Sequence, residues 1–379
     1  MCVHKVDKKI QVAIVVDWLV GFSGAEFVLK SMLELFPDAD IFTTVDFLPE
    51  KDRAFLEGHQ VHTTFIQKLP KAKTQYRQYL ALMPLAVEQL DLSSYSLVIS
   101  SSHAVAKGVI TGPLQTHISY IHSPIRYAWD LQHQYLQESG LTKGIKSWVA
   151  RVILHYIRMW DLRTAHGVDH FAANSSFIAK RVWKVYRREA QVIHPPIDCD
   201  AFEPCSEKGD FYFTSSRLVP YKKINLIIEA FNQMPERRLV VSGDGPDREK
   251  LEQLAGPNVE MKGHLSFGEY KDHLAKSKAF IHVALEDFGI VMVEALASGT
   301  PVIALDQGGS LDIVKDGENG LLIQGQSEAA LIEGIKRFEQ STLLDPEQIA
   351  ATAKGFDSKV FKEKFTQLVT QAGAGEFLG

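Results

Sequence analysis

Short apolar runs recur along the sequence, and each is followed by turn residues and then by a helix-like stretch. This alternation is typical of parallel sheets that are covered by helices on both faces. We expect strands at residues 11–17, 41–45, 97–101, 117–123, 170–174, 211–215, 238–242, 259–262, 279–283, 301–305 and 320–323. The sequence therefore predicts an α/β fold made of two successive doubly wound units.

The length of 379 residues also favours two domains, because a single hydrophobic core usually stops growing at about 250–300 residues. Pro195 and Pro196 fix the backbone and cannot join a central strand, so the segment 194–198 is expected to be a stiff linker. We predict a first domain over residues 1–193 and a second over residues 194–355. A last helical pattern follows at residues 358–370.

Composition excludes several classes of protein. The 45% hydrophobic and 23% charged residues are ordinary for a packed globular protein, and no run approaches about 18 apolar residues. The polar segment 1–9 lacks the apolar core of a signal peptide, which predicts a cytoplasmic protein. Three cysteines without metal-ligand spacing support neither a disulfide framework nor a zinc site.

Charge is distributed unevenly along the chain. Residues 51–190 hold 18 Lys and Arg against 9 Asp and Glu, which favours an anionic partner such as a membrane surface or a phosphorylated lipid. Scattered, solvated lysines give the same count, so both interpretations stay open. Within this region, residues 141–166 mix basic side chains with Trp, Ile, Val and Tyr and predict a basic amphipathic helix. Such a helix either lies on an anionic bilayer or packs its apolar side inside the first domain.

The strongest local feature is the segment from Glu286 to Glu294, which follows an expected strand and opens a helix. A strand, a glycine turn and a helix start place backbone N–H groups and the positive helix end at the carboxyl edge of a sheet, where anions bind. That position suits a diphosphate. The two carboxylates flank the turn and can accept hydrogen bonds from sugar and ribose hydroxyls, so two hydroxyl-rich parts of one ligand can be held together.

Two further turns are expected at the same edge. The first is Gly308-Gly309-Ser310, and the second carries Arg217 and Lys222, five residues apart. Fixed cations neutralise a departing nucleoside diphosphate. The first expected strand is not followed by a Gly-x-Gly-x-x-Gly signature, which argues against a dinucleotide dehydrogenase.

Together these motifs resemble those of the retaining glycosyltransferases of family four, which have the GT-B architecture of two facing Rossmann-like domains with a cleft between them. The resemblance spans nearly the whole chain. It implies that the last helix returns to the first, acceptor-side domain, so that residues 356–379 belong with it. The second domain then binds the nucleotide sugar.

The resemblance also implies a role for each donor-site residue. Glu286 meets the donor sugar and Glu294 the ribose, while Arg217 and Lys222 bind the diphosphate. The full set of implied donor-binding residues is Gly24, Arg217, Lys222, Gly243, Gly263, His264, Glu286, Asp287, Phe288, Gly289, Ile290 and Glu294. Within it, Gly243 belongs to a turn near the nucleoside, and the backbone near Gly263 and His264 meets the base.

In the first domain, Ser23-Gly24-Ala25-Glu26 resembles the family's Gly-Gly-x-Glu loop, whose backbone approaches the donor phosphate. The run from Tyr120 to Asp130 matches the family's active-site turn and implies a catalytic role for His122, together with Glu286, Arg217 and Lys222. The acceptor side is expected to include Ser123, Arg126 and Asn174.

Three positions depart from the family pattern. Ser23 replaces the first glycine of the phosphate loop, Lys223 stands where a glycine often follows the family's lysine, and Asp312 stands where Glu usually follows the Gly-Gly turn. None of these changes removes a charge type that the chemistry needs. Lys223 and Asp312 are expected to reshape the fit of the donor.

The form of the motifs is most similar to that of bacterial mannosyltransferases of surface-polysaccharide and lipopolysaccharide assembly. The resemblance implies transfer of mannose from GDP-mannose to a glycan or lipid-linked glycan, with retention. It implies no cofactor and no metal, because Arg and Lys replace a divalent ion and no Asp-x-Asp motif ends a suitable strand. We expect no nucleic-acid partner. A sugar-nucleotide epimerase or hydrolase, and a binding protein without turnover, are the alternatives.

Overall fold

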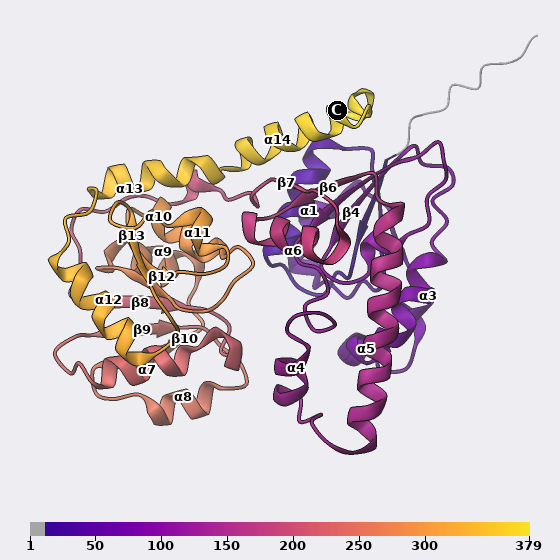
Figure 1. The fold of residues 1–379 in the computed structure, drawn as a ribbon. Coiled ribbons are helices and arrows are strands. Elements are labelled where there is room, and N and C mark those ends of the chain that lie inside the picture. The colour runs from indigo at the N-terminus through magenta and orange to yellow at the C-terminus, as the bar shows by residue number, and fades with distance from the viewer. Residues whose placement is uncertain (1–11) are drawn as a thin grey trace, which may run out of the picture. The chain divides into compact units, whose positions relative to one another are not determined.

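The computed structural model describes residues 12–379. Cys2, the polar segment 1–9 and the first residue of the first expected strand lie outside the described residues. The chain divides into two compact units (Figure 1). Unit 1 runs to Pro195 and also contains Phe361–Gly379, and unit 2 comprises Pro196–Val360.

In unit 1, residues 12–192 form one sheet of seven parallel strands in the order β3-β2-β1-β4-β5-β6-β7. The strands are β1 (Val12–Val16), β2 (Asp40–Thr43), β3 (Val61–Thr63), β4 (Leu97–Ser102), β5 (Thr116–Ile121), β6 (His170–Ala173) and β7 (Gln191–Val192). The helices are α1 (Gly24–Leu35), α2 (Ala72–Gln75), α3 (Met83–Glu88), α4 (Gln132–Glu138), α5 (Gly144–Thr164), α6 (Ser176–Tyr186) and α14 (Ser358–Gln371).

Strand β1, an inner strand of this sheet, is buried on both faces. Ile14 packs in a core shared with α1 and with Phe361 and Phe365 of α14. Val15 packs on the opposite face, in a core that includes Trp160 of α5. Burial on both sides is why β1 is a continuous apolar run rather than an alternating one.

In unit 2, residues 212–323 form a second sheet of six parallel strands in the order β10-β9-β8-β11-β12-β13. The strands are β8 (Tyr212–Ser215), β9 (Leu239–Ser242), β10 (Val259–Gly263), β11 (Phe280–His282), β12 (Val302–Leu305) and β13 (Gly320–Ile323). The helices are α7 (Ile224–Asn232), α8 (Arg248–Leu254), α9 (Phe267–Lys276), α10 (Ile290–Ala297), α11 (Ser310–Ile313), α12 (Glu328–Gln340) and α13 (Pro346–Ala353). The prediction of two doubly wound, Rossmann-like units is confirmed.

Two details differ from the sequence-based expectations. Strands β3 and β7 were not expected; they have three and two residues, too few for a periodic pattern to show. The unit boundaries fall at Pro195 and Phe361 rather than at residues 193 and 356. The reason is that Ile197 pairs with the segment around Asp357, donating to Phe356 O at 3.1 Å and accepting from Ser358 N at 3.0 Å, which keeps residues 356–360 with unit 2.

Between residues 12 and 379, no helix has both the length and the apolar character that crossing a bilayer requires.

Candidate functional site

The strand order of unit 2 has one point of reversal. From β8 the chain moves outward to β9 and β10, whereas β11 pairs on the other side of β8 and leads outward to β12 and β13. The loops after β8 and β11 therefore leave the carboxyl edge of the sheet in opposite directions. This switch point is where open α/β sheets bind their ligands.

The two loops are joined by an ion pair. Lys222, in the short 3-10 helix Pro220–Lys222 after β8, donates to Oε1 of Glu286, which follows β11. Both side chains are largely buried, with 17% and 13% of their surfaces exposed. His282, the last residue of β11, places Nε2 3.6 Å from the same oxygen.

The surroundings of Glu286 keep it ionised. Burial opposes the charged form, but Lys222 and His282 outweigh it and lower the pKa of Glu286 to about 2. Its second oxygen, Oε2, accepts no hydrogen bond from the part of the chain that the structure describes. A fixed anion with one oxygen open is suited to accept hydrogen bonds from the hydroxyls of a ligand.

Arg217 lies on the same loop as Lys222 but in a different environment. Its side chain is exposed, and among residues 12–379 it forms no hydrogen bond or ion pair. The loop thus offers one cation held by Glu286 and one cation available to an external anion.

Glycines allow the neighbouring turns to approach closely. A Cβ on Gly243 would lie 1.8 Å from Ser216 O, and its φ of 134° is strained for other residues. In the second turn, a Cβ on Gly309 would lie 2.3 Å from Phe288 Cα, and Gly309 N donates to Glu286 O at 2.9 Å. The first turn holds the loops after β8 and β9 together, and the second turn holds the loops after β11 and β12 together.

The second carboxylate of the motif has a tyrosine partner. Glu294, inside α10, accepts a 2.6 Å hydrogen bond from Tyr270 OH of α9. Burial raises the pKa of Glu294, an effect that the tyrosine hydrogen bond partly offsets. Gly289 precedes α10 with a φ of 97°, the left-handed conformation that glycine adopts most easily.

The remaining predicted donor residues divide into two groups. Asp287 and Ile290 are partly buried, Gly263 closes β10 and His264 is exposed. Phe288 is different: its ring is 3% exposed and packs on Phe356 at 5.7 Å. The Phe288 ring therefore belongs to the core, and its backbone is the part that remains for the predicted contact with the donor.

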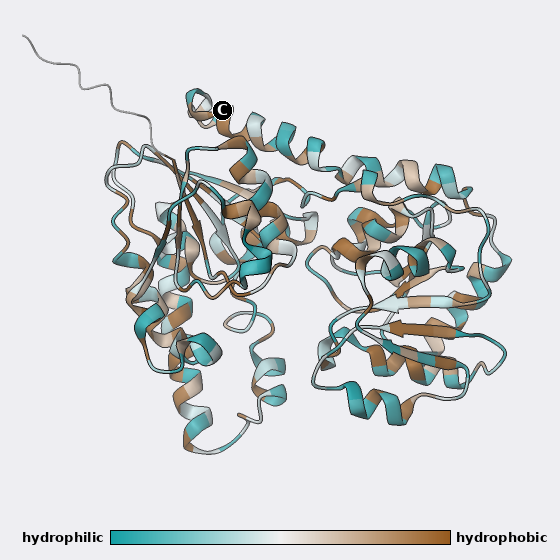
Figure 2. Cartoon of the chain, turned by 180° about the vertical axis from the view of Figure 1, so that it is seen from behind, coloured by the Kyte–Doolittle hydropathy of each residue, from teal (hydrophilic) through white to brown (hydrophobic). Residues whose placement is uncertain are grey.

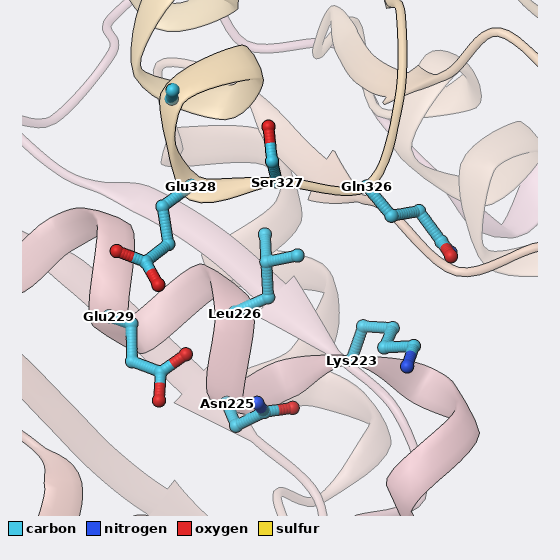
Figure 3. A pocket seen from close by; sticks show the side chains of 8 residues that line it. Lys223, Asn225, Leu226, Glu229, Gln326, Ser327 and Glu328 are labelled. Carbon is cyan, nitrogen blue, oxygen red and sulfur yellow. The ribbon is translucent and has the colours of Figure 1, made fainter.

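A surface depression of about 510 Å³ lies between α7 and the start of α12, lined by Lys223, Asn225, Leu226, Glu229, Gln326, Ser327, Glu328 and Ala329 (Figure 3). No predicted donor residue lines it. Figure 3 shows Lys223 and Gln326 at one end and the carboxylates of Glu229 and Glu328 at the other. Mixed charges without buried polar groups give this depression no evident ligand, so the switch point remains the candidate site of unit 2.

The sheet of unit 1 has its own switch point, between β1 and β4, and there the chain supplies the anion itself. Asp17, directly after β1, is buried and accepts hydrogen bonds from the four backbone N–H groups of residues 103–106, at 2.6 to 3.0 Å. His103 Nδ1 lies 2.9 Å from the same carboxylate. Burial opposes its charge, but His103 and the backbone donors outweigh it and lower the pKa of Asp17 to about 2.

His122 lies just after β5, the next strand of this sheet. Its Nε2 is 2.8 Å from Ser101 Oγ. Burial lowers the pKa of His122 to about 3, and the neighbouring His103 acts in the same direction. The ring is therefore a neutral imidazole near pH 7, suited to hydrogen bonding and not to carrying charge.

The predicted acceptor-side residues surround His122 in part. Asn174 donates from Nδ2 to His122 O at 3.0 Å. Ser123 is 4% exposed, and its hydroxyl donates to Pro124 O and accepts from Arg181 Nη1 at 3.1 Å. The Ser123 side chain is thus engaged internally, while Arg126 is only partly buried.

The predicted phosphate loop of unit 1 starts a helix. Gly24 is the first residue of α1, and Ser23 precedes it. Glu26 accepts from both the backbone N–H and the hydroxyl of Ser23, at 2.9 and 2.8 Å. This capping box explains why a serine fits where the family has a glycine.

Two buried side-chain atoms in residues 12–379 have no hydrogen-bond partner, Asn174 Oδ1 and His282 Nε2. Each lies beside one of the two groups described above, in unit 1 and unit 2 respectively. Buried polar atoms without a partner are rare and costly, which makes both regions candidates for contact with a polar ligand. The described residues contain no cluster of three or more His, Cys, Asp or Glu side chains arranged to hold a metal.

Sequence reasoning missed three of the residues that shape these sites. Asp17 ends the first apolar run, and His282 stands four residues before Glu286, so each was visible as a polar residue at the carboxyl end of a strand. Tyr270 offered no such signal. Its pairing with Glu294 depends on how α9 packs against α10.

Comparison with known proteins finds a family that resembles the second unit. The family described as glycosyl transferases group 1 matches residues 200–355. The chain is 36% identical over 137 residues to the GtfA subunit of a UDP-N-acetylglucosamine–peptide N-acetylglucosaminyltransferase from Streptococcus parasanguinis, spanning 32% of this chain and 26% of that one. It is 32% identical over 136 residues to a phosphatidyl-myo-inositol mannosyltransferase from Mycobacterium leprae, spanning 34% of each. The chain thus covers only about a quarter to a third of these two relatives.

A solved structure matches the chain over nearly its whole length. The Anabaena protein Alr3699/HepE, crystallised in complex with UDP, superposes with a TM-score of 0.69 at 17% identity, covering 96% of this chain and 100% of that one. The TM-score shows that the two chains share a fold, whereas an identity of 17% does not show which ligand this chain binds. The chain therefore has the GT-B fold, and its second unit matches the group 1 glycosyl transferases.

Proposed function

We propose that this protein transfers a hexose from a nucleotide sugar to a glycan or lipid-linked glycan acceptor. The observation that carries the proposal is the switch point of unit 2, where Lys222 is paired with Glu286 while Arg217 stays exposed on the same loop. A nucleotide sugar has a diphosphate for the cations and hydroxyls for the carboxylates. The match of residues 200–355 to the group 1 glycosyl transferases supports the same activity.

Each site residue has a role in this proposal. Arg217 and Lys222 neutralise the diphosphate, and Glu286 accepts hydrogen bonds from hydroxyls of the donor sugar through its open oxygen. Glu294, oriented by Tyr270, accepts from the ribose. The turns at Gly243 and Gly263 border the nucleoside. In unit 1, the neutral imidazole of His122 hydrogen-bonds a sugar hydroxyl.

The reaction needs no protein nucleophile. The acceptor oxygen bonds to the anomeric carbon as the bond from that carbon to the diphosphate oxygen breaks, and the diphosphate leaves with the electron pair. A leaving phosphate oxygen takes the acceptor proton, so both partners meet on one face and the configuration is retained. The protein contributes orientation and stabilisation of the leaving charge, the two terms that dominate such reactions.

Mannose and GDP are the more specific part of the proposal. They rest on the Glu-Asp-Phe-Gly-Ile form of the motif at residues 286–290, and on the partial similarity to a mannosyltransferase. The complex of the Anabaena protein with UDP makes UDP-sugars the competing donors. We further propose that the chain acts in the cytoplasm without a metal, because Arg217 and Lys222 supply the charge that a divalent ion would otherwise bring.

The test is a panel of GDP-, UDP-, ADP- and dTDP-sugars, measured by thermal shift and by nucleotide release, with and without EDTA. Wild type, Glu294→Ala and the control Glu333→Ala are compared, since Glu333 is an exposed residue of α12. We expect GDP-mannose alone to stabilise wild type and the control, and Glu294→Ala to lose the response. Stabilisation by UDP-sugars only would overturn the donor, and no response to any nucleotide would overturn the site.

The acceptor decides between transfer and the alternatives. Release of nucleotide that rises with added glycan or lipid-linked glycan, together with an α-anomeric product from an α-linked donor by NMR, supports a retaining transferase. Release that is independent of acceptor identifies a hydrolase or epimerase. Donor binding with no turnover under any acceptor identifies a binding protein.

A further inference from the structure

Helix α5 of unit 1 has two apolar sides, and only one of them is buried. The inner side packs Leu154, Ile157 and Trp160 into the unit. The outer side exposes five large residues at spacings of three and four, which place them on one face of the helix. They are Ile145 (83% exposed), Trp148 (67%), Val152 (48%), Tyr156 (44%) and Met159 (54%), and we call them the α5 stripe.

The inner side holds α5 firmly in place. Lys107 pairs with Asp161 at 2.7 Å, and Trp129 Nε1 donates to the same carboxylate at 2.7 Å. Trp160 Nε1 donates to Glu88 of α3 at 2.8 Å, so α3 and α5 lie side by side (Figure 1). The helix therefore does not need its outer stripe in order to fold, and the stripe is a fixed surface feature.

The stripe is flanked by basic side chains. Lys146, Arg151 and Arg163 are exposed on α5, and Lys143 precedes the helix. The single acidic residue between Gly144 and Thr164 is Asp161, which is fully buried. Figure 2 shows brown, apolar segments recurring along this helix between polar ones. Glu88 of α3 pairs with Arg163 near the end of the helix, so the excess positive charge of the outer face lies towards its start, at Lys143, Lys146 and Arg151.

We propose that the α5 stripe is a docking surface for an anionic membrane. A rigid helix that presents Trp, Tyr and aliphatic side chains with lysines at its start is built to lie in the interface plane, with its apolar side chains among the acyl chains and its cations on the headgroups. From Ile145 to Met159 the stripe runs for about 21 Å at 1.5 Å per residue, so it contacts several lipids at once.

Charge favours a membrane over a second copy of the chain. A symmetric dimer through this face would bring the same patch of both copies together, and Lys143, Lys146 and Arg151 of one copy would meet basic side chains of the other, since the nearby carboxylate of Glu88 is already paired with Arg163. An anionic bilayer complements the positive charge and also accepts the exposed apolar side chains. The proposal concerns unit 1 and does not rest on the donor assignment in unit 2.

The test is flotation of the full chain with vesicles of phosphatidylcholine, and with vesicles that also contain phosphatidylglycerol, in the absence of donor and acceptor. We expect wild type to float with the anionic vesicles and to be released by 0.5 M salt. Ile145→Ser/Trp148→Ser should lower the partition coefficient at least about tenfold, because two large apolar side chains leave the interface. Lys143→Gln/Lys146→Gln should lower it about fivefold for each lysine, on anionic vesicles only.

A matched double variant separates the stripe from general surface hydrophobicity. Leu114→Ser/Trp183→Ser removes a leucine that is 94% exposed and a tryptophan that is 53% exposed elsewhere in unit 1, and it should float like wild type. Unchanged circular dichroism shows that each variant is folded.

Three outcomes overturn the proposal. The first is that wild type does not float with anionic vesicles, and the second is that the matched control loses as much binding as the stripe variant. The third is that light scattering finds wild type to be a dimer and the stripe variant a monomer, which would assign the surface to a second copy. Because flotation is read without catalysis, its failure leaves the donor panel of unit 2 unaffected.

Discussion

The two sheets reverse their strand order in the same way, yet the two reversal points use their charged groups differently. In unit 1 the position between β1 and β4 is filled by Asp17, whose carboxylate accepts hydrogen bonds from the backbone N–H groups of residues 103–106. In unit 2 the position between β8 and β11 is bordered by the ion pair of Lys222 with Glu286 and by the exposed Arg217. The anion of unit 1 is fully used inside the protein, whereas unit 2 keeps a cation exposed.

This difference shows that the fold offers an anion site at each reversal point. One or two side chains determine whether an internal carboxylate or an external anion occupies it. The N–H groups after β4 are of the kind that bind phosphate in other open sheets, but here they are already satisfied. These N–H groups of unit 1 are therefore not available to an external anion.

The largest effect is expected for Asp17→Asn. The substitution removes a buried charge that four N–H groups and His103 require, and the asparagine NH₂ points a donor at donors. We expect unit 1 to lose about 3–5 kcal/mol of unfolding free energy, as for other broken buried charge networks, measured by denaturant unfolding. The exposed Asp38→Asn should change stability by less than about 0.5 kcal/mol. Equal stability of the two variants would show that unit 1 does not require the charge of Asp17.

The next effect is on the reaction. Lys222→Gln removes the cation of the unit 2 switch point and leaves Glu286 without its ion pair. We expect kcat/KM for transfer to fall by about 10²–10³, or about 2.7–4 kcal/mol, the loss seen when a preorganised electrostatic group is deleted. Lys223→Gln is the control, because that side chain lines the depression of Figure 3 and does not contact Glu286. A comparable loss in both variants contradicts the assignment.

Acid should affect both switch points in the same direction. The pKa values of Asp17 and Glu286 are lowered to about 2 in the folded protein, so each carboxylate stabilises the fold above its ordinary pKa, and that stability is lost as the pH falls from about 4.5 towards 2. Each should contribute about 2–3 kcal/mol at neutral pH. Unfolding measured between pH 7 and pH 2.5 should show the decline, and Asp17→Asn should flatten it for unit 1 alone. A decline of the same size in that variant would show that other groups cause it.

The smallest effect is expected at Lys223, one of the three positions that depart from the family pattern. Lys223 has a φ of 58°, a left-handed conformation that costs an ordinary residue about 1 kcal/mol or more, which explains why a glycine is common there. Lys223→Gly should stabilise unit 2 by about 0.5–1 kcal/mol, measured as a shift in its denaturation midpoint. Lys223→Ala retains a Cβ and should give no gain. A gain from both variants would assign the effect to the lysine side chain rather than to the backbone.

Much of this organisation could be predicted from the sequence. The apolar runs located the central strands of both sheets, because a strand buried on both faces must be continuously apolar. The short edge strands β3 and β7 were missed. A strand of two or three residues forms because it pairs with its neighbour, and it is too short to show a pattern of its own. Helix α1 begins directly after Ser23, which forms with Glu26 a capping box that the sequence itself displays.

The sequence predicted which residues belong to the candidate site but not which of them contact one another. Glu286 and Lys222 were assigned to one ligand from their motifs, whereas their direct ion pair depends on the adjacency of β8 and β11. The role of Asp17 depends in the same way on the loop after β4, 86 residues further along the chain. For Phe288 the motif predicted a place in the donor site, and the structure adds that its ring packs in the core against Phe356.

The hydrogen bonds between Ile197 and the segment 356–358 have an evolutionary consequence. They mean that the chain enters and leaves unit 2 at neighbouring points, as an inserted domain does. The whole switch point of unit 2 is then carried on one segment with two adjacent junctions, which recombination can exchange without cutting the sheet of unit 1. Replacement of that segment would change the ligand-facing groups of unit 2 and leave those of unit 1 in place.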